Sequence, residues 1–97
     1  MLYTINKSPF ATNHLESALR FAPSGAPILL YEDGVYAAVE APLIAAAMKA
    51  ALADHPVYAL DADLEARGLT RVLEGVQVID YDGFVELVEQ HDVAPWL

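Results

Sequence analysis

The chain has 97 residues, 56 % of them apolar, and its 14 acidic against five basic residues give a formal net charge of −9. A chain of this charge repels the phosphate backbone, so direct nucleic-acid binding is not expected. The absence of cysteine excludes disulfides, thiolate metal sites, a thiol nucleophile and a persulfide on this chain.

The length predicts one domain spanning residues 1–97, because so few residues cannot build two hydrophobic cores. The apolar surplus of so small a domain predicts an oligomer or an obligate partner. No apolar run approaches the roughly 20 residues of a membrane span, and the N-terminal residues lack the basic-then-apolar pattern of a secretory signal. We therefore expect a soluble, cytoplasmic protein without membrane contact.

The first third of the chain predicts a strand, a helix and a second strand. Leu2–Ile5 is β-prone and stops at a turn-forming cluster that ends in Pro9. Asn13 and Glu16 have the spacing of a capping box, which predicts a helix over His14–Phe21. A Pro-Ser-Gly sequence then ends this helix.

The stretch from Ala26 to Ala38 is the part around which we expect the domain to be organised. Its apolar run lacks polar alternation, which is typical of a strand covered on both faces in the middle of a parallel sheet. Glu32, Asp33 and Gly34 then supply a turn. Ligand and partner surfaces gather at the carboxyl ends of such strands, so function is sought first in this loop.

The middle of the chain predicts mainly helix. Residues 35–39 fit either a helical turn, which we favour, or an extended continuation. Proline in a first turn favours a helix over Pro42–Ala53. Its expected apolar face contains Leu43, Ile44, Ala47, Met48, Ala51 and Leu52.

Two further strand-helix pairs are predicted in the last part of the chain. Residues 56–60 form a short apolar strand, followed by a helix that Asp61 caps and Gly68 ends. Residues 75–80 form a fourth strand, and Asp82 caps a last helix. Its expected buried stripe consists of Phe84, Val85, Leu87 and Val88. Trp96, in the tail, either anchors an interface or docks on its own domain.

The alternation of four strands and four helices predicts an α/β domain with a mostly parallel sheet and helices on its faces. Three of the four loops that follow the strands are acidic. Asp61 with Asp63, and Asp80 with Asp82, have the oxygen donors that Mg²⁺ prefers. Each pair also stands at a helix start, where capping alone explains it, and we favour capping.

Other catalytic or binding sites find little support. The three histidines lack ligand spacing and are expected to be solvated, and no serine lies in a Gly-x-Ser-x-Gly elbow. Lys7 and Ser8 could meet an anion at the start of the first helix, but the glycines of a phosphate loop are absent. We expect no catalytic residue, metal or cofactor on this chain.

Four segments together resemble the TusB/DsrH family over essentially the whole length. They are residues 2–10 (LYTINKSPF), 32–38 (EDGVYAA), 58–68 (YALDADLEARG) and 80–85 (DYDGFV) with the tail to Trp96. The resemblance implies a DsrE-like fold and membership of a heterohexamer, a dimer of three related small subunits. The resemblance also implies that the two sister subunits are TusC/DsrF-like and TusD/DsrE-like, and that the large-subunit relative carries the persulfide-forming cysteine.

The resemblance implies a chiefly structural subunit of a sulfur relay that reaches a sulfur-carrier protein through its sisters. One branch passes sulfur toward 2-thiouridine at the wobble position of tRNA, which we favour, and the DsrH branch serves dissimilatory sulfur oxidation. From a different class, the acidic strand ends leave open a self-associating domain that binds a small molecule or a metal.

One position departs from the family pattern. The DsrH branch often has a cysteine in a Leu-Glu-Ser-Cys-Leu sequence, where this chain has Ala18, and alanine cannot accept sulfur. The loss favours the TusB branch, although residues 6–10 look more DsrH-like. The expected interface or loop residues are Lys7, Ser8, Phe10, Glu32, Asp33, Gly34, Tyr36, Tyr81 and Trp96.

Overall fold

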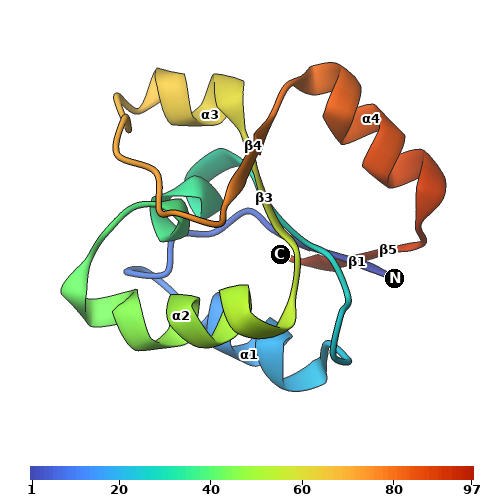
Figure 1. Ribbon diagram of the computed structural model, residues 1–97, viewed down its shortest axis with the longest axis horizontal. Helices are drawn as coiled ribbons and strands as arrows, with labels where there is room; N and C mark the ends of the chain where they lie inside the picture. Colours follow the sequence, from blue (N-terminus) through green and yellow to red (C-terminus); the bar gives the residue numbers. More distant parts are fainter.

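Five parallel strands form one sheet in the computed structural model, which describes residues 1–97 (Figure 1). The elements in chain order are β1 (Leu2–Ile5), α1 (His14–Phe21), β2 (Ile28–Leu30), the 3₁₀ helices η1 (Glu32–Ala38) and η2 (Pro42–Ile44), α2 (Ala45–Asp54), β3 (Val57–Leu60), α3 (Asp61–Ala66), β4 (Gln77–Ile79), α4 (Tyr81–Gln90) and β5 (Val93–Trp96). The predicted α/β class is confirmed. No helix is both long and apolar enough to cross a membrane.

The strand order β4-β3-β2-β1-β5 places β1, β2 and β3 inside the sheet, with β4 and β5 at its edges, and every pair is parallel. The chain moves outward from β1 to β4 and then crosses back through α4 to reach the other side of β1. Because βαβ crossovers are right-handed, a reversal of direction puts its helix on the opposite face. Accordingly, α1 and α2 lie on one side of the strands and α4 on the other (Figure 1).

The core is divided between the two faces of the sheet. The larger cluster joins Tyr3 and Ile5 of β1 to α1 and α2, and the smaller one joins Leu2 and Leu29 to Leu87 of α4. All three residues of β2 have no exposed surface, which confirms the prediction of a strand covered on both faces. Full burial of each such side chain stabilises the fold by about 2 kcal/mol.

The tail forms a fifth strand, which the sequence did not predict. Residues 93–96 pair with β1 at the edge of the sheet, from Leu2 opposite Val93 to Ile5 opposite Trp96. Pro95 lies within this strand, and the edge position tolerates it because the missing donor of a proline can face away from the ladder.

Three predicted helix caps were wrong in detail. Asn13 occupies the N-cap position of α1, but its side chain makes no capping bond. Asp61 is the first residue of α3 rather than its cap. The N-cap of α4 is Asp80, not Asp82, and its carboxylate accepts from the N–H of Gly83 at 2.8 Å.

The helix boundaries and faces differ from the expectation at several positions. Residues 35–38 are helical as favoured, within η1, and the predicted second helix begins as η2 and continues as α2. Leu43 is 78 % exposed because it lies in η2, where the helical phase differs from that of α2. Val85 and Val88 are exposed because only the Phe84 and Leu87 side of α4 faces the sheet.

Candidate functional site

The acidic loops meet at one edge of the sheet, because the carboxyl ends of parallel strands lie together. The loops that follow β2, β3 and β4 each carry carboxylates at this edge. η1 contacts both β3 and α3 there. The strand-end loops therefore lie together, and the contacts between them define what they can do.

The turn after β2 is held tightly against the end of β1. The N–H of Tyr31 donates to the carbonyl oxygen of Ile5 at 3.1 Å, and the N–H of Gly34 donates to that of Tyr31 at 2.9 Å. A Cβ atom on Gly34 would lie 2.0 Å from the Ile5 carbonyl oxygen. Glu32 has a left-handed backbone with φ of 48°. Position 34 therefore requires glycine because the backbone of β1 approaches too closely for a side chain. The left-handed backbone of the same turn lies at Glu32 and not at the glycine.

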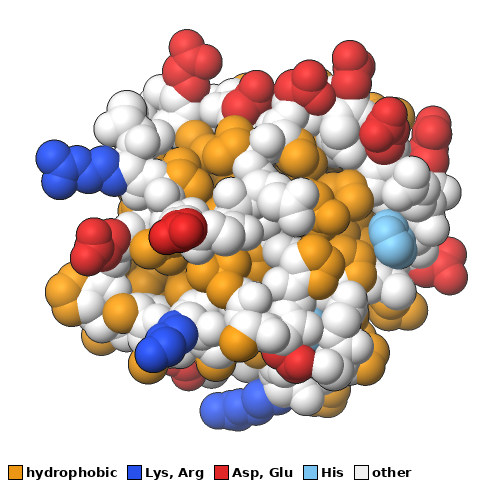
Figure 2. All heavy atoms as spheres, in the orientation of Figure 1, with side chains coloured by type: hydrophobic (Ala, Val, Ile, Leu, Met, Phe, Trp, Pro, Cys, Tyr) orange, Lys and Arg blue, Asp and Glu red, His pale blue; other side chains and the backbone are white.

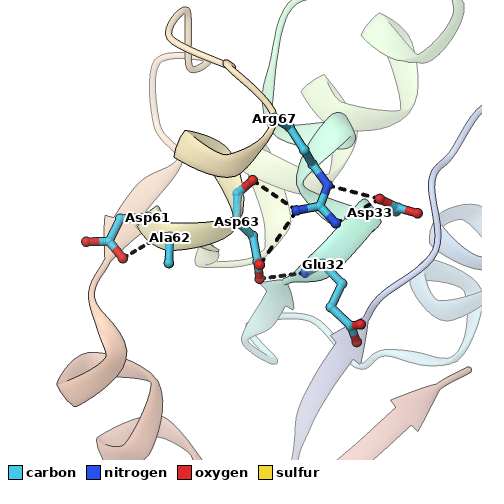
Figure 3. Close-up of polar contacts among 6 residues, drawn as sticks. All are labelled: Glu32, Asp33, Asp61, Ala62, Asp63 and Arg67. Atoms are coloured by element: carbon cyan, nitrogen blue, oxygen red, sulfur yellow. Dashed lines mark hydrogen bonds and ion pairs between the residues drawn. The ribbon is translucent and has the colours of Figure 1, made fainter.

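Arg67 joins the loops after β2 and β3 (Figure 3). Its Nε donates to Asp33 Oδ1 at 2.9 Å, and its Nη1 donates to the carbonyl oxygen of Asp63 at 3.1 Å. The second carboxylate oxygen of Asp63 accepts from the backbone N–H of Glu32 at 2.7 Å. We call Asp33, Asp63 and Arg67 the Arg67 clasp.

The clasp engages Asp63, one of the four carboxylates that the sequence offered for metal binding. Arg67 lies 3.6 Å from Asp63 as well as 2.9 Å from Asp33, so one guanidinium serves both acids. Asp61 accepts from the N–H of Ala62, and Asp80 caps α4. No group of three or more His, Asp or Glu side chains is arranged to hold a metal ion. The geometry is that of a structural joint between loops.

Aromatic side chains continue from this joint to the start of α4. The ring of Tyr31 meets Phe84 edge-on at 6.3 Å, and Tyr81 stacks on Phe84 at 5.6 Å. Burial, and then the negative charge of Glu32, raise the pKa of the Tyr31 phenol, against an opposing hydrogen bond with Thr4. Tyr31 therefore stays neutral at physiological pH, and Tyr81 remains 67 % exposed.

The predicted anion-binding residues lie apart from the clasp, in the loop between β1 and α1. Ser8 Oγ accepts from the N–H of Phe10 at 3.1 Å, and the Ser8 carbonyl oxygen accepts from Ala11 and Thr12. Ser8 thus organises its own turn, while Lys7 is exposed. Phe10 is 50 % exposed and borders a cavity of about 360 Å³ shared with Leu43.

Trp96 docks on its own domain. Its ring packs against Tyr3 at 5.7 Å and against Phe21 at 5.8 Å, between β1 and α1. Ala18 lies on the buried side of α1 with no exposed surface. A side chain at position 18 therefore faces the core rather than the solvent. Tyr36, in η1, is half-buried.

The histidines and serines form no catalytic arrangement. His55 is 7 % exposed, and its Nδ1 donates to the carbonyl oxygen of Ala26 at 2.8 Å, so the prediction of a solvated side chain was wrong. The residues around His55 gave no sign that its side chain binds the backbone at Ala26, in the turn before β2. Ser24 donates its hydroxyl to the carboxylate of Asp54 rather than to a histidine, so it forms no serine-histidine pair.

Arg67 is the site residue that the sequence analysis did not predict. The available signal was an arginine four residues after Asp63 on a short helix, facing an acidic loop of the preceding strand. A basic residue at this spacing, in a chain with only five, was the feature to follow.

Comparisons with known proteins agree along nearly the whole chain. A family model described as "DsrH like protein" matches residues 7–94. Protein TusB from Serratia proteamaculans is 43 % identical over 94 residues, and protein TusB from Shigella flexneri is 40 % identical over 92 residues; each match covers 94 % of both chains. The solution NMR structure of protein Tm0979 from Thermotoga maritima has a TM-score of 0.63 at 25 % identity, over 95 % of each chain.

These matches agree with the four segments that carried the resemblance in the sequence. They also confirm the small α/β fold that it implied. The chain belongs to the TusB/DsrH family.

Proposed function

We propose that this chain is a structural, non-catalytic subunit of a sulfur-relay complex. In this proposal it assembles with a TusC/DsrF-like and a TusD/DsrE-like sister into a cytoplasmic dimer of heterotrimers. The TusD/DsrE-like sister carries the persulfide, and a sulfur-carrier protein is reached through the sisters. The sulfur is passed toward 2-thiouridine at the wobble position of tRNA.

The observation that carries the proposal is a family match without a thiol. One relative named TusB is 43 % identical and matches over 94 % of both chains, and the present chain has no cysteine. Since the persulfide requires a cysteine sulfur, a family member without one contributes by assembly rather than by carrying sulfur. Membership of the family supports the role of sulfur-relay subunit.

The site geometry supports a structural role. In the Arg67 clasp the charged side chains form ion pairs with one another, and Tyr31 stays neutral. Two tyrosines leave contact area at the same edge of the sheet. Tyr81 is exposed, and Tyr36 is half-buried in η1, the helix that also contains Asp33. Tyrosine combines a large apolar ring with a polar tip, which suits protein interfaces. We assign Tyr36 to a subunit contact.

The second candidate is the DsrH-type role in dissimilatory sulfur oxidation. It is favoured by the DsrH-like character of residues 6–10 and by the family model that matches from residue 7. Alanine at position 18, where the DsrH branch often has cysteine, and relatives named TusB favour the tRNA role.

The deciding experiment replaces the TusB gene of a bacterial host with the gene for this chain. Liquid chromatography and mass spectrometry of hydrolysed tRNA then measure wobble 2-thiouridine, with the empty deletion strain and the native gene as references. We expect the modification to return. If the chain is expressed and co-purifies with the host sisters but thiolation stays at the deletion level, the tRNA role is wrong.

A further inference from the structure

The outward side of α4 combines two kinds of surface that an isolated domain does not need. Gly83, Phe84 and Leu87 face the sheet. On the outside, Tyr81, Val85 and Val88 follow one another at spacings of four and three residues and are 67 %, 43 % and 37 % exposed. This spacing places them in one strip along the helix.

A strip of carboxylates runs beside the apolar one. Asp82, Glu86 and Glu89 repeat at the same spacings and are all exposed. Residues 72–97 contain three further acids and no lysine or arginine. Figure 2 shows a row of acidic side chains along the upper rim, over α3 and α4, whereas the left and lower parts of the same face carry both acidic and basic side chains.

Local helix stability does not account for the apolar strip. Valine and tyrosine are poorer helix formers than alanine, leucine, lysine or glutamate, so their presence at exposed positions gains nothing for an isolated helix. Single exposed apolar residues are ordinary on protein surfaces. Three of them along one side of a helix form a continuous apolar surface, and such surfaces commonly mark interaction sites.

We propose that the outer side of α4 is the docking surface for one sister subunit, which presents lysine and arginine beside an apolar strip. This inference rests on the proposed function. Charge complementarity selects the occupant: a second copy of this chain would bring the same acidic strip against itself, and a nucleic acid would add phosphates to it. Tyr81, Val85 and Val88 supply the apolar centre, and the three carboxylates supply the charged rim.

The test co-expresses this chain with its two sisters and measures the affinity of each variant for the purified sister pair. The variant Glu86→Lys/Glu89→Lys reverses the rim. The control Glu16→Lys/Glu40→Lys makes the same change in net charge at exposed sites outside α4. We expect about tenfold or greater weakening for the first variant and a change of less than about threefold for the control, because like charges at an interface oppose binding.

A second pair of measurements tests the apolar strip and keeps folding apart from binding. Val85→Ser/Val88→Ser is expected to weaken the complex while leaving the circular dichroism spectrum unchanged, since both side chains already contact solvent. If both the charge and the serine variants bind the sister pair as the wild type does, the docking surface is wrong. If charge reversal at either place weakens binding equally, only general electrostatics operates and the assignment to α4 also fails.

The outcomes separate this inference from the function on which it rests. A wild-type chain that binds neither sister refutes the proposed function. A wild-type chain that binds them while the α4 variants bind equally well refutes only the docking surface. If the isolated chain forms a dimer that Val85→Ser/Val88→Ser dissolves, the occupant is a second copy and the proposal is overturned.

Discussion

The guanidinium of Arg67 contacts the carboxylate of Asp33 at 2.9 Å and so joins two loops that are 34 residues apart in the chain. The side chain of Arg67 is 22 % exposed, whereas that of Asp33 is 59 % exposed, so solvent screens part of this ion pair. The pair fixes the loop after β2 to α3, and mutation can measure how much it contributes to the free energy of unfolding.

Arg67→Ala is expected to lower the free energy of unfolding by about 1 kcal/mol, the upper end of what a partly exposed ion pair contributes. Arg67→Lys recovers only part of this, because an ammonium cannot reproduce the planar fork that reaches both aspartates. Arg71→Ala is the control, since Arg71 is exposed and makes no ion pair. Urea unfolding gives all three values. Equal effects of the two alanine variants would show that the clasp adds nothing.

Gly34→Ala is expected to cost about 3 kcal/mol or more, because overpacking against rigid backbone forces the chain to shift. The added Cβ would lie 2.0 Å from the oxygen and 2.9 Å from the carbon of the Ile5 carbonyl. Gly68→Ala is the matched control: its φ is +66°, but nothing lies within 4 Å of the new Cβ. That variant should cost only about 1 kcal/mol of left-handed strain. Thermal and urea unfolding check both, and a Gly34→Ala variant as stable as Gly68→Ala contradicts the close approach.

Ala18→Cys is expected to give a thiol that does not react with labelling reagents in the native protein. Ala18 has no exposed surface, and a buried thiol in apolar surroundings is inert. Glu16→Cys, on the exposed side of the same helix, should label quickly. Mass spectrometry over time follows both. Rapid modification of Cys at position 18 under native conditions would show that α1 opens and that this position is accessible to sulfur donors.

Tyr31 should make the stability of the domain fall at alkaline pH. Burial, and then the negative charge of Glu32, raise the pKa of the Tyr31 phenol in the folded chain above its ordinary value. A raised pKa in the folded state means that the folded chain holds the phenol proton more tightly than the unfolded chain. The stability that Tyr31 contributes is therefore complete below the unfolded-state pKa and is lost as the pH rises through the folded-state pKa. Tyr31→Phe removes this slope. Unfolding curves across the alkaline range that stay parallel for the two proteins would contradict it.

Tyr36→Ala is expected to weaken subunit assembly without unfolding the domain. Tyr36 is half-buried in η1, whereas the neighbouring Val35, Ala37 and Ala38 are fully buried and carry the packing of this helix. Size-exclusion chromatography with the sister subunits measures assembly, and circular dichroism measures the fold. A variant that assembles at the wild-type concentration removes Tyr36 from the interface.

The sequence predicted the interior of the fold better than its edges. β1 over Leu2–Ile5 and α1 over His14–Phe21 have the predicted limits, because turn and proline signals enclose them. β2 was recognised because an unbroken apolar run is what burial on both faces requires. β5 was not predicted. Its four residues include a proline and carry little strand signal of their own, and their pairing with β1 makes them a strand.

Side-chain partners were harder to predict than elements, because they depend on contacts distant in sequence. Two aspartates at the start of α4 are equivalent caps by composition, and only the backbone decides that Asp80 accepts the bond. Burial of His55 depends on the turn at Ala26, and the role of Arg67 depends on a loop on another strand. The acidic loop was found from the sequence, but the group that neutralises it was not.

The proposal of a structural subunit is tested by native mass spectrometry of the complex, purified through a tag on this chain after co-expression with both sisters. We predict one assembly that contains two copies of each of the three chains, with persulfide sulfur on the TusD/DsrE-like sister alone. A tagged chain that is recovered only by itself, at micromolar concentration and with both sisters expressed and folded, would contradict it.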